Sequence, residues 1–230
     1  MREIVLDTET TGFEPTEGHR IVEIGAVELL NHMPTGRTYH QYINPQRSMP
    51  AEAFAVHGLG DDFLRDKPVF AHVGAAFLEF VADAPLVIHN AAFDMKFLNA
   101  ELGWAKLPLL PMTRATDTLL IARRKFPGSP ASLDALCRRF GVDNSAREKH
   151  GALLDSEILA EVYLELIGGR QPDFGLVSNG PSQGGGAGQS GTWRPGLRPK
   201  PLAPRITKEE AAAHDAFVEK LGAAALWNKV

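Results

Sequence analysis

The spacing of apolar and polar residues divides the chain into segments of different type, and the first part is strand-like. Runs of apolar and β-branched residues at positions 3–9, 21–30 and 38–43 have the lengths and the polar flanks of strands. A short turn at residues 32–36 joins the second and third runs. We therefore expect these three strands to pair as an antiparallel meander.

Beyond residue 50 the apolar residues recur every three or four positions, which is the spacing of helices, with short strand-like runs in between. Helices are expected at residues 50–58, 69–82, 90–102, 119–126 and 150–167 and in a segment that begins after Ser132, and strands at residues 86–88 and 113–118. Asn90 and Ser132 can cap the helices that follow them. Three strands followed by strands alternating with helices predict an α/β domain with a mixed sheet, ending near residue 169.

The composition changes after residue 169. Residues 179–191 are rich in Gly, Ser and Gln, and residues 194–205 in proline and basic residues, which is typical of an extended linker. A capping box at Thr207 and Glu210 then predicts a terminal helix with an apolar stripe. Because a helix of this length is unstable alone in water, we expect a partner surface to cover the stripe, with docking onto the first domain as the alternative.

Composition narrows the functional classes only slightly. A hydrophobic content of 44% and a charged content of 23% are those of a soluble globular protein, and no apolar run is long enough to span a membrane. The sequence leaves no room for a signal peptide before the first strand, and the single cysteine, Cys137, fits a reducing cytoplasm. A net charge of −4 does not favour a protein that coats nucleic acid, although it allows an enzyme that acts on it.

Carboxylates recur at the ends of the buried elements. Asp7 and Glu9 lie two positions apart at the end of the first strand, so their side chains share one face. Asp94 falls in the first turn of a helix, and Asp155 lies near the start of the last helix of the domain, with His150 five residues earlier. Each has an ordinary explanation by itself: Asp94 could stabilise a helix dipole, and His150 could be a surface residue. Together they indicate a cation site, because crowded carboxylates repel one another without one.

The residue types indicate which cations would bind. Hard ions such as Mg²⁺ take oxygen ligands, whereas structural zinc would need a set of cysteines and the chain has only one. Two divalent ions about 4 Å apart suit an in-line displacement at phosphorus. A histidine in such a site can accept the proton of the attacking water.

Three segments resemble the exonuclease motifs of the DEDDh superfamily. They are residues 7–12 (DTETTG), 89–94 (HNAAFD) and 150–155 (HGALLD), and a histidine at the start of the third motif marks this branch. Within the superfamily, residues 1–169 resemble the family of epsilon subunits of bacterial DNA polymerase III, which are proofreading 3′–5′ exonucleases. The resemblance implies a ribonuclease H-like fold: a mixed five-stranded sheet flanked by helices, here followed by a flexible C-terminal tail.

The same resemblance implies a role for each residue of the motifs. Asp7 would bridge two divalent cations, Mg²⁺ or Mn²⁺. Glu9 and Asp155 would bind the ion on the nucleophile side, and Asp94 would bind the other ion. His150 would be the general base.

Contacts with the substrate and with partners are implied in the same way. Thr10, Glu52 and His57 would contact the 3′-terminal nucleotide of single-stranded or frayed DNA. Residues 171–176 resemble the short peptide that binds the sliding clamp, and the terminal segment resembles the part that attaches to the polymerase alpha subunit. The expected partner-binding residues are Gln171, Phe174, Leu176, Phe217, Val218, Leu221 and Trp227. The resemblance also leaves room for a small accessory subunit.

The expected organisation is therefore an exonuclease domain at 1–169, a clamp-binding peptide at 170–176, a linker at 177–205 and a polymerase-binding helical segment at 206–230. Two alternatives are another DEDDh exonuclease that trims RNA ends, and a subunit that mainly serves as a scaffold. The linker and the terminal helix argue against a free-standing RNA-trimming enzyme. The intact acids and His150 argue against a subunit that is mainly a scaffold. The expected location is the bacterial cytoplasm, at the nucleoid-associated replisome.

Overall fold

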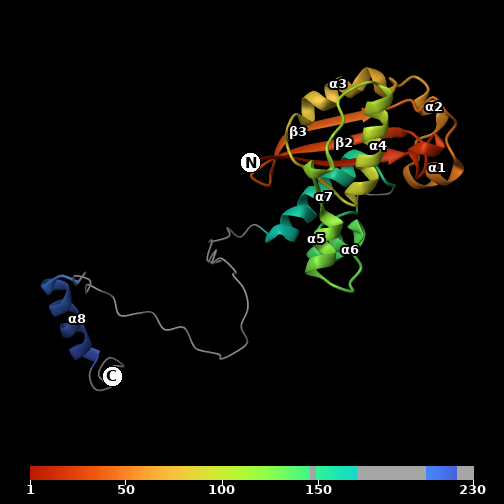
Figure 1. Cartoon of the computed structure of the whole chain (residues 1–230). Helices are drawn as coiled ribbons and strands as arrows, with labels where there is room; N and C mark the ends of the chain where they lie inside the picture. The colour runs from red at the N-terminus through yellow and green to blue at the C-terminus, as the bar shows by residue number, and fades with distance from the viewer. Residues whose placement is uncertain (146–148, 170–205, 222–230) are drawn as a thin grey trace, which may run out of the picture. The chain divides into compact units, whose positions relative to one another are not determined.

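The structure, a computed structural model, describes residues 1–145, 149–169 and 206–221 (Figure 1). Its contacts divide the chain into two units, residues 1–177 and residues 178–230. Within the described residues, no helix has both the length and the apolar character needed to cross a membrane.

The first unit is built on a mixed five-stranded sheet, as the sequence predicts. Strands β1 (Arg2–Thr10), β2 (Ile21–Leu30) and β3 (Met33–Tyr42) form an antiparallel meander. Strands β4 (Leu86–Ile88) and β5 (Ala115–Asp117) run parallel to β1, and the strand order is β3-β2-β1-β4-β5. The carboxyl ends of β1, β4 and β5 therefore meet at one edge of the sheet, and β1 is the central strand.

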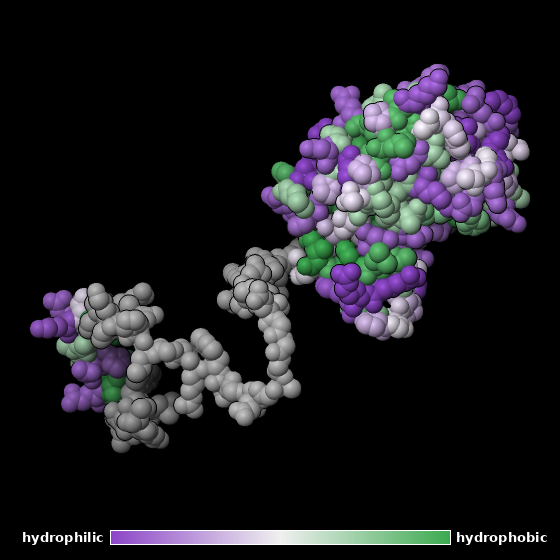
Figure 2. All heavy atoms as spheres, in the orientation of Figure 1, coloured by the Kyte–Doolittle hydropathy of each residue, from purple (hydrophilic) through white to green (hydrophobic). Residues whose placement is uncertain are grey.

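Helices cover both faces of this sheet (Figure 1). They are α1 (Ala51–His57), α2 (Asp61–Leu64), α3 (Phe70–Val81), α4 (Ala91–Trp104), α5 (Thr118–Lys125), α6 (Leu133–Phe140) and α7 (Ala152–Ile167), with 3-10 turns η1 (Pro15–Glu17) and η2 (Met112–Arg114). Alternate residues of β1 face opposite layers: Ile4 packs in a core with α3 and α4, whereas Val5 packs against α7. Figure 2 shows a green, apolar patch near α5 and α7. Leu120 of α5 and Ile167 of α7 are among the exposed large apolar residues.

The hairpin between β2 and β3 is tighter than expected. The turn consists of Asn31 and His32 alone, both with positive φ (50° and 66°), as in the two-residue turns that match the twist of paired strands. The expectation of a turn at 32–36 was wrong, because Pro34 lies within β3 and pairs with Leu29. A proline is tolerated there since β3 is an edge strand of the sheet.

Three helix starts also differ from expectation. Asp117 accepts hydrogen bonds from the backbone N–H groups of Leu119 and Leu120, so α5 begins at Thr118 and β5 is shorter than the expected strand at 113–118. Helix α7 begins at Ala152, which leaves His150 in the segment before the helix.

Asn90 precedes α4 in a left-handed conformation (φ 67°), and its side chain makes no capping hydrogen bond. Ser132 caps α6 as expected, by accepting from the Ala135 N–H.

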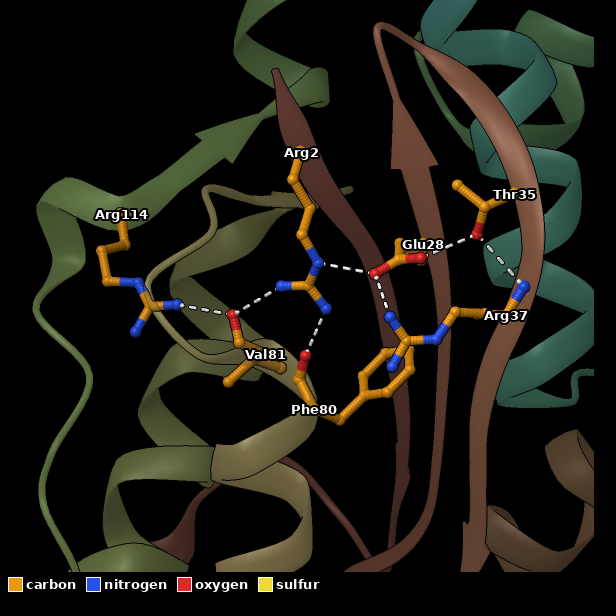
Figure 3. Close-up of polar contacts among 7 residues, drawn as sticks. All are labelled: Arg2, Glu28, Thr35, Arg37, Phe80, Val81 and Arg114. Atoms are coloured by element: carbon orange, nitrogen blue, oxygen red, sulfur yellow. Dashed lines mark hydrogen bonds and ion pairs between the residues drawn. The ribbon is translucent and has the colours of Figure 1, made fainter.

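A polar network joins the start of β1 and the end of β2 to the end of α3 (Figure 3). The guanidinium of Arg2 donates to Glu28 (2.6 Å), which also accepts from Arg37 (3.0 Å). Arg2 and Arg114 both donate to the carbonyl oxygen of Val81 (3.3 Å each). These cations satisfy carbonyls that a helix end leaves unpaired and lie at the negative end of its dipole. The hydrogen bond from Arg2 holds the pKa of Glu28 below its usual value.

The described part of the second unit is helix α8 (Lys208–Leu221). It begins with the predicted capping box: Thr207 N–H donates to Glu210 Oε2 (2.8 Å), and Glu210 N–H donates to Thr207 Oγ1 (3.2 Å). Phe217 and Leu221 are exposed on this helix, and Val218 is half-buried. The other expected partner-binding residues, Gln171, Phe174, Leu176 and Trp227, lie outside the described residues.

Candidate active site

The end of β1 carries two acids toward the layer that contains α7. Asp7 and Glu9 share the face of Val5, and Glu9 is buried whereas Asp7 is partly exposed. The register with β2 shifts just after Glu9, because Glu9 pairs with Glu23 but Thr10 pairs with Ile21. Such irregularities re-aim side chains and end the regular pairing. The regular register between β1 and β2 therefore ends directly after the two acids.

Asp94 reaches the same edge from the other layer of the molecule. It lies in the first turn of α4, is buried, and accepts two hydrogen bonds from Thr8, one from the backbone N–H (3.1 Å) and one from the hydroxyl (2.8 Å). Thr8 thus anchors Asp94 to the strand between the other two acids. The sequence did not predict this role of Thr8. Its only signal was its place between Asp7 and Glu9.

Helix α7 brings Asp155 to the site through a close contact with β2. Gly25 faces the first turn of α7 so closely that an added Cβ would lie 2.1 Å from the backbone nitrogen of Leu153. The hydroxyl of Ser156 donates to the carbonyl oxygen of Gly25 (2.9 Å) and is fully buried. This contact holds the first turn of α7, with Asp155, against the sheet near Glu9.

His150 completes the cluster. Its Nδ1 lies 3.2 Å from Oδ2 of Asp155, and half of the side chain is exposed. One ligand atom each from Glu9, His150 and Asp155 fall within 4.8 Å of one another. The structure thus brings His150 beside the acids, although it precedes α7 rather than lying on it.

All five residues of the expected reaction centre line one cavity of about 470 Å³: Asp7, Glu9, Asp94, His150 and Asp155. They come from β1, from α4, and from the start of α7 with the segment before it, and more than 50 positions separate Glu9 from Asp94 and Asp94 from His150. Convergence of this kind is not produced by strand or helix periodicity alone.

The electrostatics of the cavity favour a bound cation. Burial raises the pKa of Glu9 to about 8; the charge of His150 opposes this shift, and the charges of Asp155 and Glu23 contribute to it. Glu23 is itself buried and lies 2.7 Å from Nε2 of His40. Burial also raises the pKa of Asp94, to about 7, against the hydrogen bonds from Thr8. Carboxylate oxygens with one imidazole form a donor set that fits hard divalent cations, whose charge would let these carboxyls ionise at neutral pH.

The expected substrate-binding residues line a second cavity of about 320 Å³. Thr10, Glu52 and His57 contribute to it, and its walls share Thr8, Glu9 and Phe93 with the first cavity. The hydroxyl of Thr10 donates to the carbonyl oxygen of Gly12 (2.7 Å), so it is already used to shape the loop after β1. The structure therefore places the three residues beside the acids.

His57 is one of the buried polar residues that line this second cavity. The backbone N–H of Leu59 donates to Nδ1 (3.0 Å), which leaves the proton of the neutral ring on Nε2. Nε2 is buried and meets no acceptor with hydrogen-bond geometry among the described residues, although the carbonyl of Thr10 is near enough to favour the charged ring. Burial has the larger effect and lowers the pKa of His57, so the ring is a neutral N–H donor at the cavity wall.

Phe13 is a wall residue that the sequence analysis missed. It is 77% exposed and lines the second cavity, in the loop between β1 and η1. Lys96 of α4 donates to its carbonyl oxygen (2.9 Å) and to Glu14 (2.6 Å), which ties the loop to the helix that carries Asp94. Periodicity gives no signal for a single aromatic residue in a loop.

Comparison with known proteins gives the family. The profile of the exonuclease family matches residues 4–163. The chain is similar to proteins named DNA polymerase III subunit epsilon: 57% identical to that of Rickettsia felis over 180 residues (77% of this chain and 79% of the relative) and 49% identical to that of Rickettsia prowazekii over 224 residues (96% and 97%). It is 46% identical to the protein of Escherichia coli K12 over 238 residues (98% and 97%).

Solved structures agree on the fold. Exonuclease X in complex with 5′ overhanging duplex DNA aligns with a TM-score of 0.56 and 25% identity over 71% of this chain and 90% of that one. The nuclease domain of 3′hExo, a DEDDh family member bound to rAMP, aligns with a TM-score of 0.62 and 20% identity over 72% and 91%. The chain belongs to the family of DNA polymerase III epsilon subunits, the proofreading exonucleases of the bacterial replicase.

Proposed function

We propose that this chain removes 3′-terminal nucleotides from DNA by hydrolysis that uses two divalent cations, Mg²⁺ or Mn²⁺. Asp7, Glu9, Asp94 and Asp155 hold the ions. The observation that carries the proposal is the convergence of these acids and His150 on one cavity. When bound, two such ions stabilise the attacking and leaving oxygens of an in-line displacement at phosphorus.

His150 acts as the general base. Asp155, 3.2 Å from its Nδ1, orients the ring and stabilises the imidazolium that forms when His150 takes the proton of the attacking water. The water oxygen forms a bond to phosphorus while the bond from phosphorus to the 3′-oxygen of the preceding nucleotide breaks. The products are a nucleoside 5′-monophosphate and a strand shortened by one nucleotide, whose 3′-oxygen takes up a proton.

The second cavity takes the terminal nucleoside. Glu52 and His57 line it next to the acids, and the buried N–H of His57 offers a donor for an oxygen of the sugar. Thr10 shapes the loop that closes its edge. Because the terminal nucleotide must enter this cavity away from its template, an end that frays easily is the better substrate, which is the requirement for proofreading.

The family and the exposed apolar residues of α8 support the proposed partners and location. The apolar stripe with Phe217, Val218 and Leu221 binds the polymerase alpha subunit, and residues 171–176 bind the sliding clamp. A small accessory subunit is a further expected partner of the exonuclease domain. The chain works in the bacterial cytoplasm, at the nucleoid-associated replisome.

The proposal is tested with primers that end in a paired or a mispaired nucleotide, incubated with Mg²⁺, with Mn²⁺ or with a chelator. We expect nucleoside 5′-monophosphates as products, faster release from the mispaired end, and no release in the chelator. The same strand made of RNA should be degraded more slowly. Equal rates on paired and mispaired ends, or activity that survives metal removal, would contradict the proposal.

A further inference from the structure

The two cavities of the site meet at Thr8, Glu9 and Phe93 and extend in different directions from there. The one that contains Thr10, Glu52 and His57 is bounded by the loop after β1. The one that contains the acids continues to α5 and to the start of α6, where Leu119, Arg123 and Ser132 line it. If the terminal nucleoside occupies the cavity of His57 and the scissile phosphate lies at the acids, the rest of the strand can continue along the cavity of the acids toward α5.

Arg123 is the cationic residue in the part of the acids' cavity that lies along α5. Among the described residues, it is the only lysine or arginine that lines the cavity of the acids. It lies four positions after Leu119 on α5, so the two side chains share one helix face, whereas Arg124 points about 100° away and lines neither cavity. Its charge also acts on His89, a further wall residue: burial lowers the pKa of His89, the charge of Asp117 opposes this, and Arg123 adds a smaller lowering.

The surroundings of Arg123 suit a phosphate. Ser132 is exposed, and its oxygen accepts from the Ala135 N–H, which leaves the hydroxyl proton to donate elsewhere. Asp134, the acid of this part of the wall, accepts a hydrogen bond from the side-chain amide of Asn144 (3.1 Å). A phosphate next to the scissile one lies away from the metal-holding acids and needs a cation of its own.

We propose that the strand leaves the reaction centre over α5 and that Arg123 binds the phosphate immediately upstream of the scissile one. This assignment rests on the proposed function and adds a subsite to it: the enzyme recognises at least two consecutive phosphates. Arg123 is then a substrate-binding residue that does not touch the reacting atoms.

A comparison of substrate lengths tests the subsite. A thymidine dinucleotide contains only the scissile phosphate, whereas a thymidine decamer also contains the upstream ones. Arg123→Gln should raise KM for the decamer about fivefold, the size of one exposed ion pair, and leave kcat/KM for the dinucleotide unchanged. It should also reduce the slope of log KM against log salt concentration by about 0.7, the value for one phosphate contact to a single strand.

Two further variants serve as controls. Arg124→Gln removes a charge from the same helix outside the cavity. It should leave KM for the decamer and kcat/KM for the dinucleotide unchanged within experimental error. Arg123→Lys keeps the charge and should restore the salt dependence. Melting temperatures of all variants should agree with that of the parent chain, because the exchanged side chains are exposed.

Each other outcome has a definite meaning. Equal effects of Arg123→Gln and Arg124→Gln would overturn the assignment in favour of a diffuse surface charge. A parallel loss on the dinucleotide would overturn it in favour of a role at the reaction centre or in folding. A parent protein that hydrolyses neither substrate in Mn²⁺ would overturn the proposed function, and the subsite with it.

Discussion

At the scale of single residues, the site depends on carboxyl groups held where their charged forms are costly. Glu9 and Asp94 are buried, and Glu23 lies opposite Glu9 on the neighbouring strand. Burial of carboxylates without a counter-ion disfavours ionisation, whereas a divalent cation reverses this preference. The protons on these groups therefore link the pH, the bound metal and the stability of the fold.

The metal-free protein should lose stability as pH rises. The unfolded chain releases the protons of Asp94 and Glu9 near their ordinary pKa values of 3.8 and 4.5, but the folded protein holds them up to about 7 and about 8. Between these limits the folded state binds more protons, so the free energy of unfolding falls with rising pH. Thermal melts in chelator should show this fall. The increase in melting temperature caused by Mn²⁺ should be larger at pH 8 than at pH 6. An increase independent of pH would contradict the burial of these acids.

Thr8 should tune the affinity of Asp94 for metal. Thr8→Val keeps the shape and the backbone hydrogen bond but removes the hydroxyl that donates to Asp94 (2.8 Å). A hydrogen bond to a charged group contributes about 1.5–3 kcal/mol, so we expect the metal concentration for half-maximal activity to rise by about 10- to 100-fold. Thr35→Val removes a matched bond to Glu28 at the other end of the sheet and should leave this concentration unchanged. Equal metal requirements in the two variants would argue against the role of Thr8.

At the scale of elements, the strands and helices of the first unit could largely be predicted, whereas their close contacts could not. Alternation and helical spacing identified β1, β2, α3 and α7 within a few residues. The same patterns placed the turn before β3 too late, because local composition does not reveal that Pro34 lies on an edge strand. The motifs identified the acids, but Thr8, Phe13 and Gly25 act through contacts made only in the folded chain.

The contact between β2 and α7 should be intolerant of a methyl group. Gly25→Ala would place Cβ within 2.3 Å of backbone atoms of Ala152 and Leu153, so α7 must move and take Asp155 with it. Overpacking of this kind costs about 1–3 kcal/mol, and we expect the displacement to lower activity at least tenfold even where the protein remains folded. Activity and melting temperature should be measured together.

Gly103→Ala is the matched control for this substitution. In α4, an added Cβ at this position meets only the Leu109 side chain, at 3.9 Å, and alanine favours the helix. Its activity should equal that of the parent chain. A Gly25→Ala protein with parental activity and stability would show that the packing of α7 does not position Asp155.

At the scale of the whole molecule, the exonuclease fold and α8 belong to separate units. The carboxylates, His150 and both cavities come from residues before 156, and α8 contributes none of them. The hydrogen bonds that begin α8 are made within the helix itself. Hydrolysis and the proposed attachment to the polymerase should therefore be separable.

A chain cut after Gly169 should keep the kcat/KM of the full chain on single-stranded DNA and lose co-elution with the polymerase alpha subunit. In the full chain, Phe217→Asp should weaken the co-elution without changing hydrolysis, because this exposed side chain contributes no wall to either cavity. Glu219→Asp changes a polar side chain on the same helix and serves as the control, which should leave both co-elution and hydrolysis unchanged. Loss of hydrolysis on truncation would contradict the assignment of the exonuclease to residues 1–169.

The central claim is that separate segments of the chain hold metal ions at one point for the hydrolysis of a terminal phosphodiester. Asp7→Ala tests it most directly, with Mn²⁺ stoichiometry from calorimetry and hydrolysis of end-labelled single-stranded DNA measured on the same folded preparation. We predict loss of metal binding and a fall in kcat of about a thousandfold, with stability retained or increased because a crowded acid is removed. An Asp7→Ala protein that binds Mn²⁺ and hydrolyses DNA like the parent chain would contradict the account.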